Sequence, residues 1–413
     1  MRHIFSVLAL SLVACGGGDD DTQPADPCEA SGAICTWAGV PGQAMFAPEG
    51  EDRLEASLYL PQDIAFGSDG IPVFPDFNNH RVRHIGADDK VYTITGTGML
   101  GDGPIGSDGC YTDSPCDAMA HAWNHPTNVA VDPDDPNIVW VAAWHNSRIN
   151  KLDLTTGEII WHAGDGGRNY DGDGGPLADA TLDLPSSVAF DDRNGDLYFS
   201  DQANHIIRKI TRSGEISTIA GQPRQPGYSG DGGPAVDAML HGHTAQKADP
   251  GSKITIADGM LYLTDTVNGI VRVIDLDAGT IDLFAGKYTS AGVDEIIDPE
   301  TKEVTMVDKG SVPGFAGDGG PATEAVFNTP RDVAVGIDGE VYIADTKNSC
   351  IRVITPDGNI DTFAGQCGVT GFEGDEGPAN EALLGEPFGV EVDAEGNLYI
   401  ADTLNHVFRR VKK

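Results

Sequence analysis

Histidines stand out among the residues of this sequence that are able to bind a metal or transfer a proton. Neutral imidazoles that converge on one point bind Zn²⁺, and histidine also titrates close to neutral pH. Four of the eleven histidines, His80, His145, His205 and His406, lie in the turns expected between second and third strands, and four others come shortly before an apolar run. The second group supplies the zinc ligands that the sequence nominates, which are His121, His125, His241 and His243.

Two acidic patterns are further candidates for turn or metal chemistry. Asp-x-x-Asn recurs at Asp76, Asp201, Asp265, Asp345 and Asp402. Because Asx side chains accept hydrogen bonds from backbone N–H groups in turns, we expect these residues to cap a turn between two strands. A second motif, GDGG, resembles a calcium loop, with Asp171 and Asp173 as its best pair. No copy completes an EF-hand or nonapeptide pattern, so turn chemistry is favoured and structural calcium is the alternative.

Short apolar runs separated by turn residues position these motifs. Residues 330–365 contain four such runs, at 333–335, 341–344, 351–354 and 360–363. The intervening Asp, Asn, Gly and Pro residues and a spacing of about ten residues are typical of an antiparallel meander. Related sequence segments recur in six units with a period of about 57 residues. Four-stranded units at such a period indicate propeller blades. The sequence therefore predicts an all-β, six-bladed β-propeller of four-stranded antiparallel blades.

The two ends of the chain predict how the ring closes. The last unit ends at Lys413 without a fourth apolar run. The missing run appears near the N-terminus as Ile34-Cys35-Thr36-Trp37-Ala38-Gly39. We expect this N-terminal strand to complete the last blade, because closure removes the exposed edges of an open array.

The acidic composition excludes some partners. The chain has 64 Asp and Glu against 26 Lys and Arg, a formal net charge of −38. Phosphate backbones and anionic membrane surfaces attract basic proteins, so neither nucleic acid nor charge-driven membrane docking is expected.

The first residues have the pattern of a targeting segment. Arg2 and His3 precede an apolar run that ends in Leu12-Val13-Ala14-Cys15, which resembles the lipobox of bacterial lipoproteins. The resemblance implies a signal peptide at 1–14 and lipidation of Cys15. The glycines, aspartates and prolines that follow predict a flexible tether at 15–33. The repeat units and the closing strand place the propeller at 34–413. Gly16 follows the cysteine, which implies an outer-membrane lipoprotein of the cell envelope on either leaflet. The lipid is then the only expected contact with the membrane.

Six cysteines remain after Cys15, an even number that suits an oxidising compartment. Pairing by proximity predicts the disulfides Cys28–Cys35, Cys110–Cys116 and Cys350–Cys367, with other connectivities still open.

Three of the units closely resemble the NHL repeat. Their sequences are GNLYIADTLNHVFRRV, EVYIADTKNSCIRVI and DLYFSDQANHIIRKI. The resemblance covers about nine-tenths of the chain after Cys15. It implies a six-bladed propeller and, for most members, a platform that binds a ligand or a protein. Ala143 departs from the repeat, because it stands where other units have Asp.

Two propeller enzymes offer catalytic alternatives. A resemblance to peptidylamidoglycolate lyase implies a His-bound zinc at the channel mouth. A resemblance to gluconolactonases implies a metal held by Asn and acidic residues one position after the first-strand Pro. Here those positions carry no carboxylate: they are Gln62, Thr127, Ser186, Ser252, Arg331 and Phe388. The next positions would serve only if this register is wrong by one residue; they are Asp63, Asn128, Ser187, Lys253, Asp332 and Gly389.

No GxSxG elbow, HExxH pair or phosphate loop occurs, and no catalytic residue is nominated. We therefore expect a monomeric binding protein rather than an enzyme, with a protein, peptide or glycan ligand on the face that carries the connections between blades. The residues expected to contact the ligand are Arg331, Trp123, Trp144, Asp63, Asn128 and Asp332. The alternatives are a metal-dependent lyase or hydrolase and a purely structural envelope protein.

Overall fold

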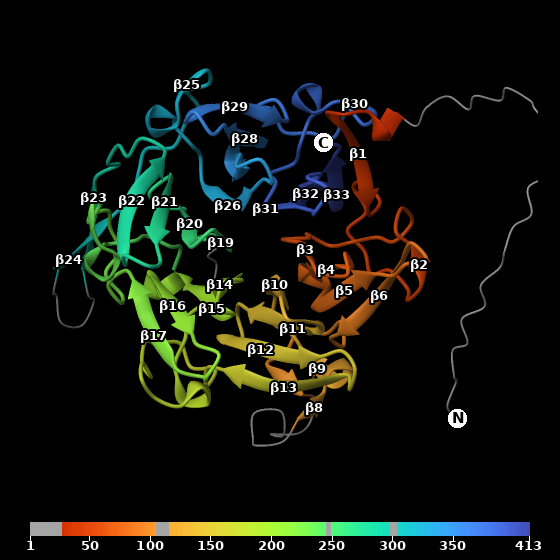
Figure 1. Cartoon of the computed structure of the whole chain (residues 1–413), viewed down its shortest axis with the longest axis horizontal. Coiled ribbons are helices and arrows are strands. Elements are labelled where there is room, and N and C mark those ends of the chain that lie inside the picture. Colours follow the sequence, from red (N-terminus) through yellow and green to blue (C-terminus); the bar gives the residue numbers. More distant parts are fainter. Residues whose placement is uncertain (1–26, 105–114, 245–248, 298–303) are drawn as a thin grey trace, which may run out of the picture.

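The computed structural model describes residues 27–104, 115–244, 249–297 and 304–413. Over these residues, six antiparallel sheets surround a central axis (Figure 1). The predicted six-bladed propeller is thus confirmed. None of the helices in the described residues has the length and apolar character needed to cross a membrane.

In blades 1 to 5 the strands run from the axis to the rim in chain order, and in blade 6 the N-terminal strand of the chain follows the C-terminal one (Figure 1). Blades 1 and 2 contain β3 (Ala65–Phe66), β4 (Pro72–Asp76), β5 (Arg81–Ile85) and β6 (Lys90–Thr95), then β10 (Pro126–Asp132), β11 (Asp135–Ala143), β12 (Arg148–Asp153) and β13 (Glu158–Ala163). Blades 3 and 4 contain β14 (Pro185–Asp191), β15 (Asp196–Asp201), β16 (Ile206–Ile210) and β17 (Ile216–Ala220), then β19 (Ile254–Ala257), β20 (Met260–Asp265), β21 (Ile270–Asp275) and β22 (Thr280–Ala285). Blades 5 and 6 contain β26 (Pro330–Val335), β27 (Val341–Asp345), β28 (Cys350–Ile354) and β29 (Asn359–Ala364), then β31 (Gly389–Val392), β32 (Leu398–Asp402), β33 (Val407–Val411) and β1 (Ala33–Ala38).

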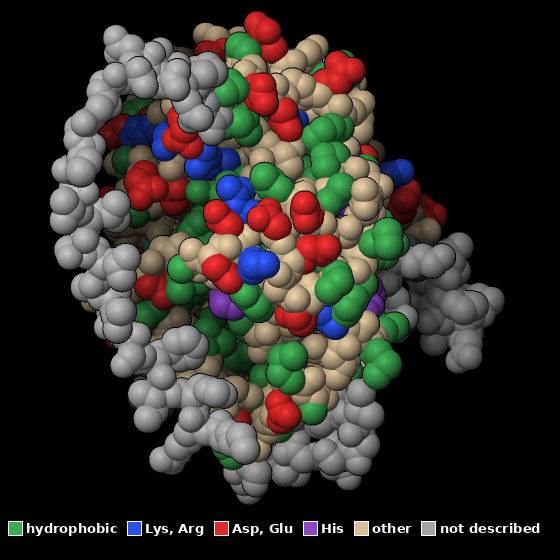
Figure 2. Space-filling model, turned by 90° about the vertical axis from the view of Figure 1, so that its right-hand side faces the viewer, with side chains coloured by type: hydrophobic (Ala, Val, Ile, Leu, Met, Phe, Trp, Pro, Cys, Tyr) green, Lys and Arg blue, Asp and Glu red, His purple; other side chains and the backbone are tan. Residues whose placement is uncertain are grey.

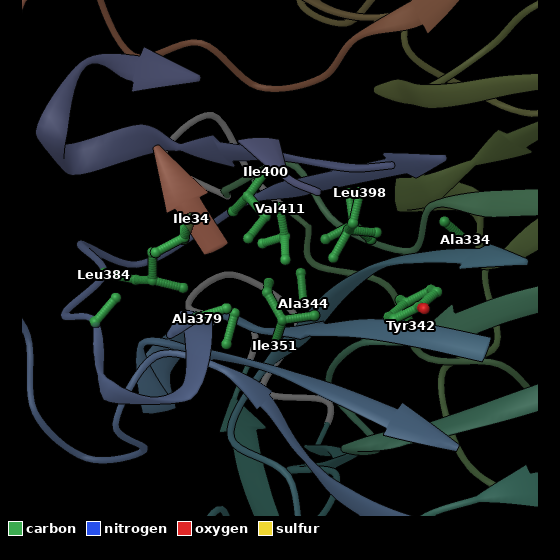
Figure 3. Close-up of a cluster of buried hydrophobic side chains, with 13 residues drawn as sticks. Ile34, Ala334, Tyr342, Ala344, Ile351, Ala379, Leu384, Leu398, Ile400 and Val411 are labelled. Carbon is green, nitrogen blue, oxygen red and sulfur yellow. The ribbon is translucent and has the colours of Figure 1, made fainter. Parts of the chain in front are cut away.

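The N-terminal strand closes the ring as the sequence predicts. β1 pairs antiparallel with β33, so that Ile34 lies opposite Val411. Ile34 is fully buried and belongs to one cluster with Leu384, Ile351 and Val411, between blades 5 and 6 (Figure 3). Burial of this cluster from water stabilises the closed ring.

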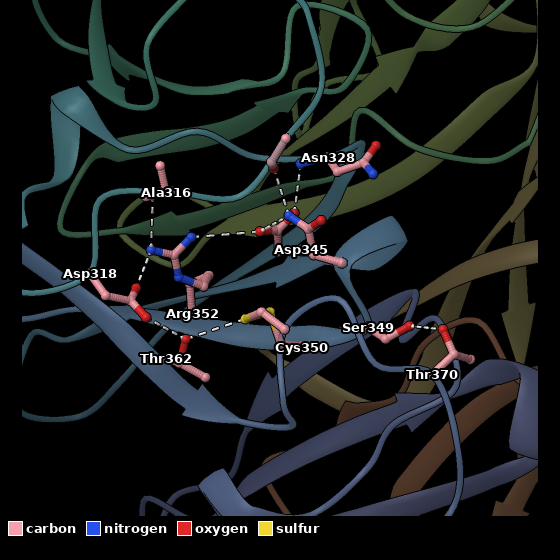
Figure 4. The surroundings of a disulfide bond; sticks show 12 residues. Ala316, Asp318, Asn328, Asp345, Ser349, Cys350, Arg352, Thr362 and Thr370 are labelled. Atoms are coloured by element: carbon pink, nitrogen blue, oxygen red, sulfur yellow. Dashed lines mark hydrogen bonds and ion pairs between the residues drawn. A yellow bond between two sulfur atoms is a disulfide. The ribbon is translucent and has the colours of Figure 1, made fainter.

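Two of the three predicted disulfides are present. Cys28 is joined to Cys35 in β1, with 5.8 Å between their Cα atoms. Cys350 at the start of β28 is joined to Cys367, with a Cα–Cα distance of 5.0 Å (Figure 4). Cys15 and Cys110 lie outside the described residues, so their predicted roles stay predictions.

The GDGGP connections are bound to the blades instead of looping freely between them. β25 (Gly320–Pro321) adds to the outer edge of β29, and β18 (Gly233–Pro234) and β30 (Gly377–Pro378) do the same in blades 4 and 6. The backbone comes very close to the following turn: a Cβ on Gly317, which has φ +102°, would lie 2.7 Å from the Cα of Ala325. Glycine is therefore required at this position for steric and conformational reasons.

A buried arginine on the third strand explains why each connection is held. Arg83, Arg208, Arg272, Arg352 and Arg409 occupy this position in blades 1, 3, 4, 5 and 6, and none of them is exposed. The Arg352 guanidinium lies between Asp318 of the connection and Asp345 at the end of β27, with 3.7 Å to the Asp345 carboxylate (Figure 4). Arg208 likewise lies 2.5 Å from Asp173 and 3.6 Å from Asp201. Asp173 of the best GDGG pair is thus bound to an arginine.

The Asp-x-x-Asn residues have a structural role, but one of the predicted partners is wrong. Asp345 accepts a hydrogen bond from the Nδ2 of Asn348 at 2.8 Å, within the turn. Its other oxygen accepts from the backbone N–H of Asn328, also at 2.8 Å, in the connection that leads into β26. The Asp side chains therefore tie the connection to the blade and do not cap the N–H groups of the turn itself.

Blade 2 lacks both partners of this ion pair. Ala143 replaces the Asp, and Asn150 stands at the arginine position of β12. The two changes are consistent with each other, because a buried arginine without its carboxylate is strongly unfavourable. The edge of blade 2 is still covered by its connection, since β8 (Cys116–Asp117) pairs with β13 as β25 pairs with β29. An additional pair joins β7 (Gly103–Pro104) to β9 (His121–Ala122).

The ion pair can be tested by copying blade 2 into blade 5. We expect Arg352→Asn to lower the free energy of unfolding by about 3 kcal/mol or more, because Asp345 is left buried and unpaired. The double variant Asp345→Ala with Arg352→Asn should lose less than the single variant. Urea unfolding measures both, with the exposed Arg224→Asn as the control, expected within about 0.5 kcal/mol of the parent. A double variant less stable than Arg352→Asn would contradict this role of the ion pair.

Candidate functional site

The axis of the ring is lined by the second of the two sets of residues considered for a lactonase site. Asp63 accepts a hydrogen bond from the Nδ2 of Asn128, and Lys253 contacts both Asp63 and Asp332. The register assumed for the sequence was therefore wrong by one residue. The physical reason is a bulge near the start of β10, β14 and β26, where the pairing skips residues 127, 186 and 331.

These axial side chains connect neighbouring blades. The side-chain oxygens of Asn128, Ser187 and Asp332 each accept a hydrogen bond from the backbone of the next inner strand. The donors are the N–H groups of Val188, Ile254 and Val390, at 2.7, 3.2 and 3.0 Å. The polar axis thus satisfies inner-edge backbone groups that have no further strand to pair with.

Lys253 takes the place where a gluconolactonase-like metal would be expected. Its Nζ donates to the carbonyl oxygen of Gln62 at 2.7 Å and to Asp332 at 3.2 Å, and lies 3.4 Å from Asp63. An ammonium between the two carboxylates supplies the positive charge that a dication would bring. The donor set therefore does not fit a hard metal, and no step of a reaction is derived through one.

Glu391 on β31 is the acidic group that this lysine does not neutralise. Its side chain lines a cavity of about 220 Å³ next to the axial residues, together with Asp63, Asn128 and Asp332. Burial, and next the negative charge of Asp63, raise the pKa of Glu391 to about 8. Glu391 is therefore largely protonated at neutral pH and able to donate a hydrogen bond.

The four predicted zinc ligands are divided between two blades. His121 is fully buried in β9 with its ring against Trp123, and His125 precedes β10. His241 and His243 lie in the connection into blade 4, where the ring of His241 packs against that of His205. Among the described residues no three His, Cys, Asp or Glu side chains are arranged to hold a metal ion.

A different set of histidines does come together, on the face that carries the turns between the second and third strands, which we name the upper face. His125 and His145 share a hydrogen bond, with 3.0 Å between their Nδ1 atoms, and the ring of His80 packs edge-on against His125. Burial lowers the pKa of both His125 and His145 to about 4. These imidazoles are uncharged at neutral pH and act as hydrogen-bonding groups rather than as cations.

All six predicted ligand contacts are buried: Asp63, Asn128 and Asp332 line the axial cavity, and the other three pack within the protein. Trp123 is 0% and Trp144 2% exposed. Arg331 is 1% exposed; its guanidinium lies 4.0 Å from the Phe388 ring centre and 2.8 Å from the Asp249 carboxylate. Trp144 lies beneath the surface and stacks on the ring of His145, with 4.1 Å between the ring centres.

An open cleft of about 490 Å³ lies beside His145 on the upper face of blade 2. Its walls are Asp102, Asn124, His145, Asn146, Arg148, Asp165, Gly166 and Arg168. Asp102 accepts hydrogen bonds from the amides of Asn124 and Asn146, at 3.1 and 3.3 Å. Arg168 is held loosely, because its nearest carboxylate, that of Asp183, is 4.0 Å away. The cleft therefore carries two arginines and two aspartates beside neutral hydrogen-bonding groups, and of the two arginines Arg168 has only a long contact with a carboxylate.

Sequence reasoning missed the residues of this cleft, although a signal was present. Aligning the six units shows that the blade 2 unit alone has lost the ion-pair pattern, with Ala143 and Asn150 in its place. When one unit lacks a structural interaction that the other units share, that unit is a candidate for a functional site. Arg148 lies between these two positions, and Arg168 follows them in the chain.

Comparisons with known proteins agree with the fold. The family model described as NHL repeat matches residues 327–354. Protein SUPPRESSOR OF QUENCHING 1, chloroplastic, of Arabidopsis thaliana is 27% identical over 297 residues, which cover 70% of this chain and 25% of that protein. Human Teneurin-4 is 27% identical over 318 residues, which cover 71% of this chain and 10% of that protein. The chain thus corresponds to a quarter or less of these relatives.

Solved structures extend the likeness to almost the whole ring. A structural genomics protein of unknown function from Bacteroides thetaiotaomicron superposes with a TM-score of 0.60 at 20% identity, covering 92% of this chain and 75% of that one. An auxiliary nutrient binding protein from the same species has a TM-score of 0.57 at 14% identity, covering 91% and 75%. At these identities the likeness establishes the propeller fold.

The raised pKa of Glu391 predicts a pH dependence of stability. Its pKa is about 8 in the folded protein against an ordinary value of 4.5, so the folded state binds the proton more tightly. Stability should therefore fall as the pH rises from about 4.5 through about 8. Asp63, Asp332 and Lys253 face this group, and the two aspartates have raised pKa values of their own.

We expect Glu391→Gln to flatten the decline of the melting temperature between pH 5 and about pH 9. Differential scanning fluorimetry measures the slope for the parent, for Glu391→Gln and for Glu215→Gln, which removes an exposed carboxylate in the turn before β17. Equal slopes for all three proteins would show that Glu391 is ionised in the fold.

Proposed function

We propose that this protein is an exported, lipid-anchored propeller that binds a protein, peptide or glycan ligand on its upper face at the cell envelope. The observation that carries the proposal is the cleft of about 490 Å³ beside His145, on the blade that has given up the ion pair of the repeat. Pockets of this size, with a few polar groups at fixed positions, are typical of ligand sites.

The charges of the cleft favour a carboxylate-bearing ligand. The chain as a whole has a net charge of −38, so a partly exposed cation that no carboxylate approaches closely is well placed to attract an anionic group. Arg168 provides that cation, and Arg148 lies on the same wall with its Nη2 donating to the Asp165 carbonyl oxygen at 2.5 Å. A guanidinium binds a carboxylate through two parallel hydrogen bonds, which gives orientation as well as affinity.

The face itself is suited to recognition. Connections between blades vary in sequence on a repeated scaffold, and variable loops on a rigid scaffold usually carry binding sites. The nearby aromatic layer of Trp144, Phe77 and His125 is buried and holds the His145 side of the cleft in place. A pre-formed wall lowers the entropy cost of binding.

The anchoring part of the proposal is supported by the sequence alone. Cys15 ends a lipobox-like run, and the cysteines of the propeller form disulfides, which suit an exported protein.

Arg168→Glu tests the ligand site. The parent protein, labelled and applied to arrays of acidic peptides and glycans, should bind a subset of them. We expect the variant to lose about tenfold or more in affinity for that subset, because a cation is replaced by a carboxylate. Lys309→Glu makes the same change in charge on the exposed hairpin of β23 (Val293–Ile297) and β24 (Val304–Asp308), and should leave binding unchanged. No bound peptide or glycan, or equal loss in both variants, would contradict the proposal and favour a structural envelope role.

Cys15→Ala tests the anchor. In a bacterium that expresses the full chain, the parent should incorporate a palmitate analogue and sediment with membranes. The variant should remain unlabelled and appear in the soluble exported fraction. Labelling of the variant, or a soluble parent, would contradict lipidation at Cys15.

A further inference from the structure

A second cavity lies on the opposite, lower face, between blades 2 and 3. Its volume is about 460 Å³, and its walls come from β11, β12 and β13 on one side and from β14, β15, β16 and the 211–214 turn on the other. Its aromatic, charged and hydroxyl side chains include Trp140, Trp161, Phe190, Lys151, Arg212 and Ser213. This cavity shares no residue with the upper cleft, so a ligand bound in it is independent of the proposed function.

The aromatic wall is an enlarged version of a pair that the repeat uses elsewhere. In blades 4, 5 and 6 an aromatic residue of the second strand packs edge-on against one of the fourth strand, as in Tyr342 with Phe363 at 4.9 Å. In blade 2 both members are tryptophans, Trp140 and Trp161, with 5.1 Å between ring centres. The flanking Ile160 is 37% exposed, so part of this apolar wall faces solvent.

A cation without a direct ion pair lies over the aromatic wall. The Nζ of Lys151 lies 5.2 Å from the Trp140 ring centre. After hydrogen bonds from Thr155, its charge helps to lower the pKa of Asp153 at the end of β12, but among the described residues no carboxylate lies within ion-pair distance of it. The equivalent cations in blades 3 and 6 are paired: Lys209 lies 3.5 Å from Asp196, and Arg410 lies 2.7 Å from Glu29. Lys151 thus lacks a direct ion pair at a strand position where the cations of blades 3 and 6 form one.

Hydrogen-bonding groups complete the cavity. Thr211 and Ser213 present hydroxyl groups on the blade 3 side, 2.9 Å from each other. The indole N–H of Trp140, a residue that is only 7% exposed, has no hydrogen-bond acceptor among the described residues, and a buried donor without a partner is costly. Arg212 spans the gap to blade 2, with its Nη2 2.5 Å from Asp134 and 3.4 Å from Asp132, and fixes the width of the cavity.

We propose that this cavity is a binding site for an acidic carbohydrate, a short oligosaccharide of uronic acid residues. The C–H face of a pyranose ring packs on the exposed part of the tryptophan wall, as apolar faces do on aromatic rings. The carboxylate of the sugar pairs with Lys151, and the ring hydroxyls exchange hydrogen bonds with Thr211 and Ser213. A cavity of about 460 Å³ accommodates one or two sugar rings.

Titration of the purified full chain with trigalacturonate, followed by tryptophan fluorescence and by calorimetry, tests this assignment. We expect saturable binding that weakens as salt is added, since an ion pair contributes. Maltotriose, which has the same ring type without a carboxylate, should bind at least about tenfold more weakly.

Variants assign the binding to the cavity. Lys151→Met should lower the affinity for trigalacturonate by about tenfold and remove the salt dependence of binding. Trp161→Ala should abolish binding. Lys209→Met removes the paired lysine at the same strand position of blade 3 and should leave binding unchanged, as should Arg168→Glu in the upper cleft. Circular dichroism and the melting temperature verify that each variant folds.

The assignment fails if trigalacturonate does not bind at up to about 10 mM. It also fails if binding survives both Lys151→Met and Trp161→Ala, or if maltotriose binds as tightly as trigalacturonate. Loss of binding in Arg168→Glu with retention in Lys151→Met would move the acidic sugar to the upper cleft and overturn the lower site.

Discussion

The buried arginine of the third strand is the interaction on which this propeller depends. A guanidinium in the protein interior is stable only where carboxylates and carbonyl groups satisfy it, and removal of one partner costs several kcal/mol. Arg352 meets this requirement with one aspartate from its own blade and one from the connection that arrives from the preceding blade. Each connection is thereby made part of the blade that it enters, and neighbouring blades are coupled through charge as well as through their apolar faces. Acidic side chains are also spread over the side of the ring seen in Figure 2.

Relief from this constraint explains why blade 2 is unusual. With Ala143 and Asn150 in place of the ion pair, the blade has no guanidinium to satisfy at this position, although its connection still pairs with the edge of β13 through β8. Four of the five tryptophans of the chain lie in or next to this blade, at positions 123, 140, 144 and 161. The upper cleft beside His145 and the lower cavity beside Trp161 both border it. We infer that blades 1, 3, 4, 5 and 6 serve as the scaffold and that blade 2 is the blade used for recognition.

The sequence predicted the fold well, because the information was local and repeated. Alternating apolar runs and Asx–Gly turns define the strands, and the missing last run beside the extra first one defines the closure by Ile34. The axial register was wrong by one residue, since a bulge near Pro126, Pro185 and Pro330 leaves no trace in an apolar pattern. The burial of Trp123, Trp144 and Arg331 was also missed, because residue type indicates what a side chain is able to bind but not which side of a loop covers it. The partners of Lys253 lie about 80 to 190 residues away, and only the three-dimensional structure brings them together.

Native-state hydrogen exchange at the GDGG connections tests the coupling between blades most directly. The amides of Gly319 and Ala322 donate to Ile360 and Gly358, at 2.8 and 2.9 Å, while Asp318 in the same connection is held by Arg352. If the arginine makes the connection part of the blade, these two amides exchange as slowly as those of β29 and with the same dependence on denaturant. Rapid exchange of Gly319 and Ala322, while β29 stays protected, would show that the connections open independently and that the buried arginine does not couple one blade to the next.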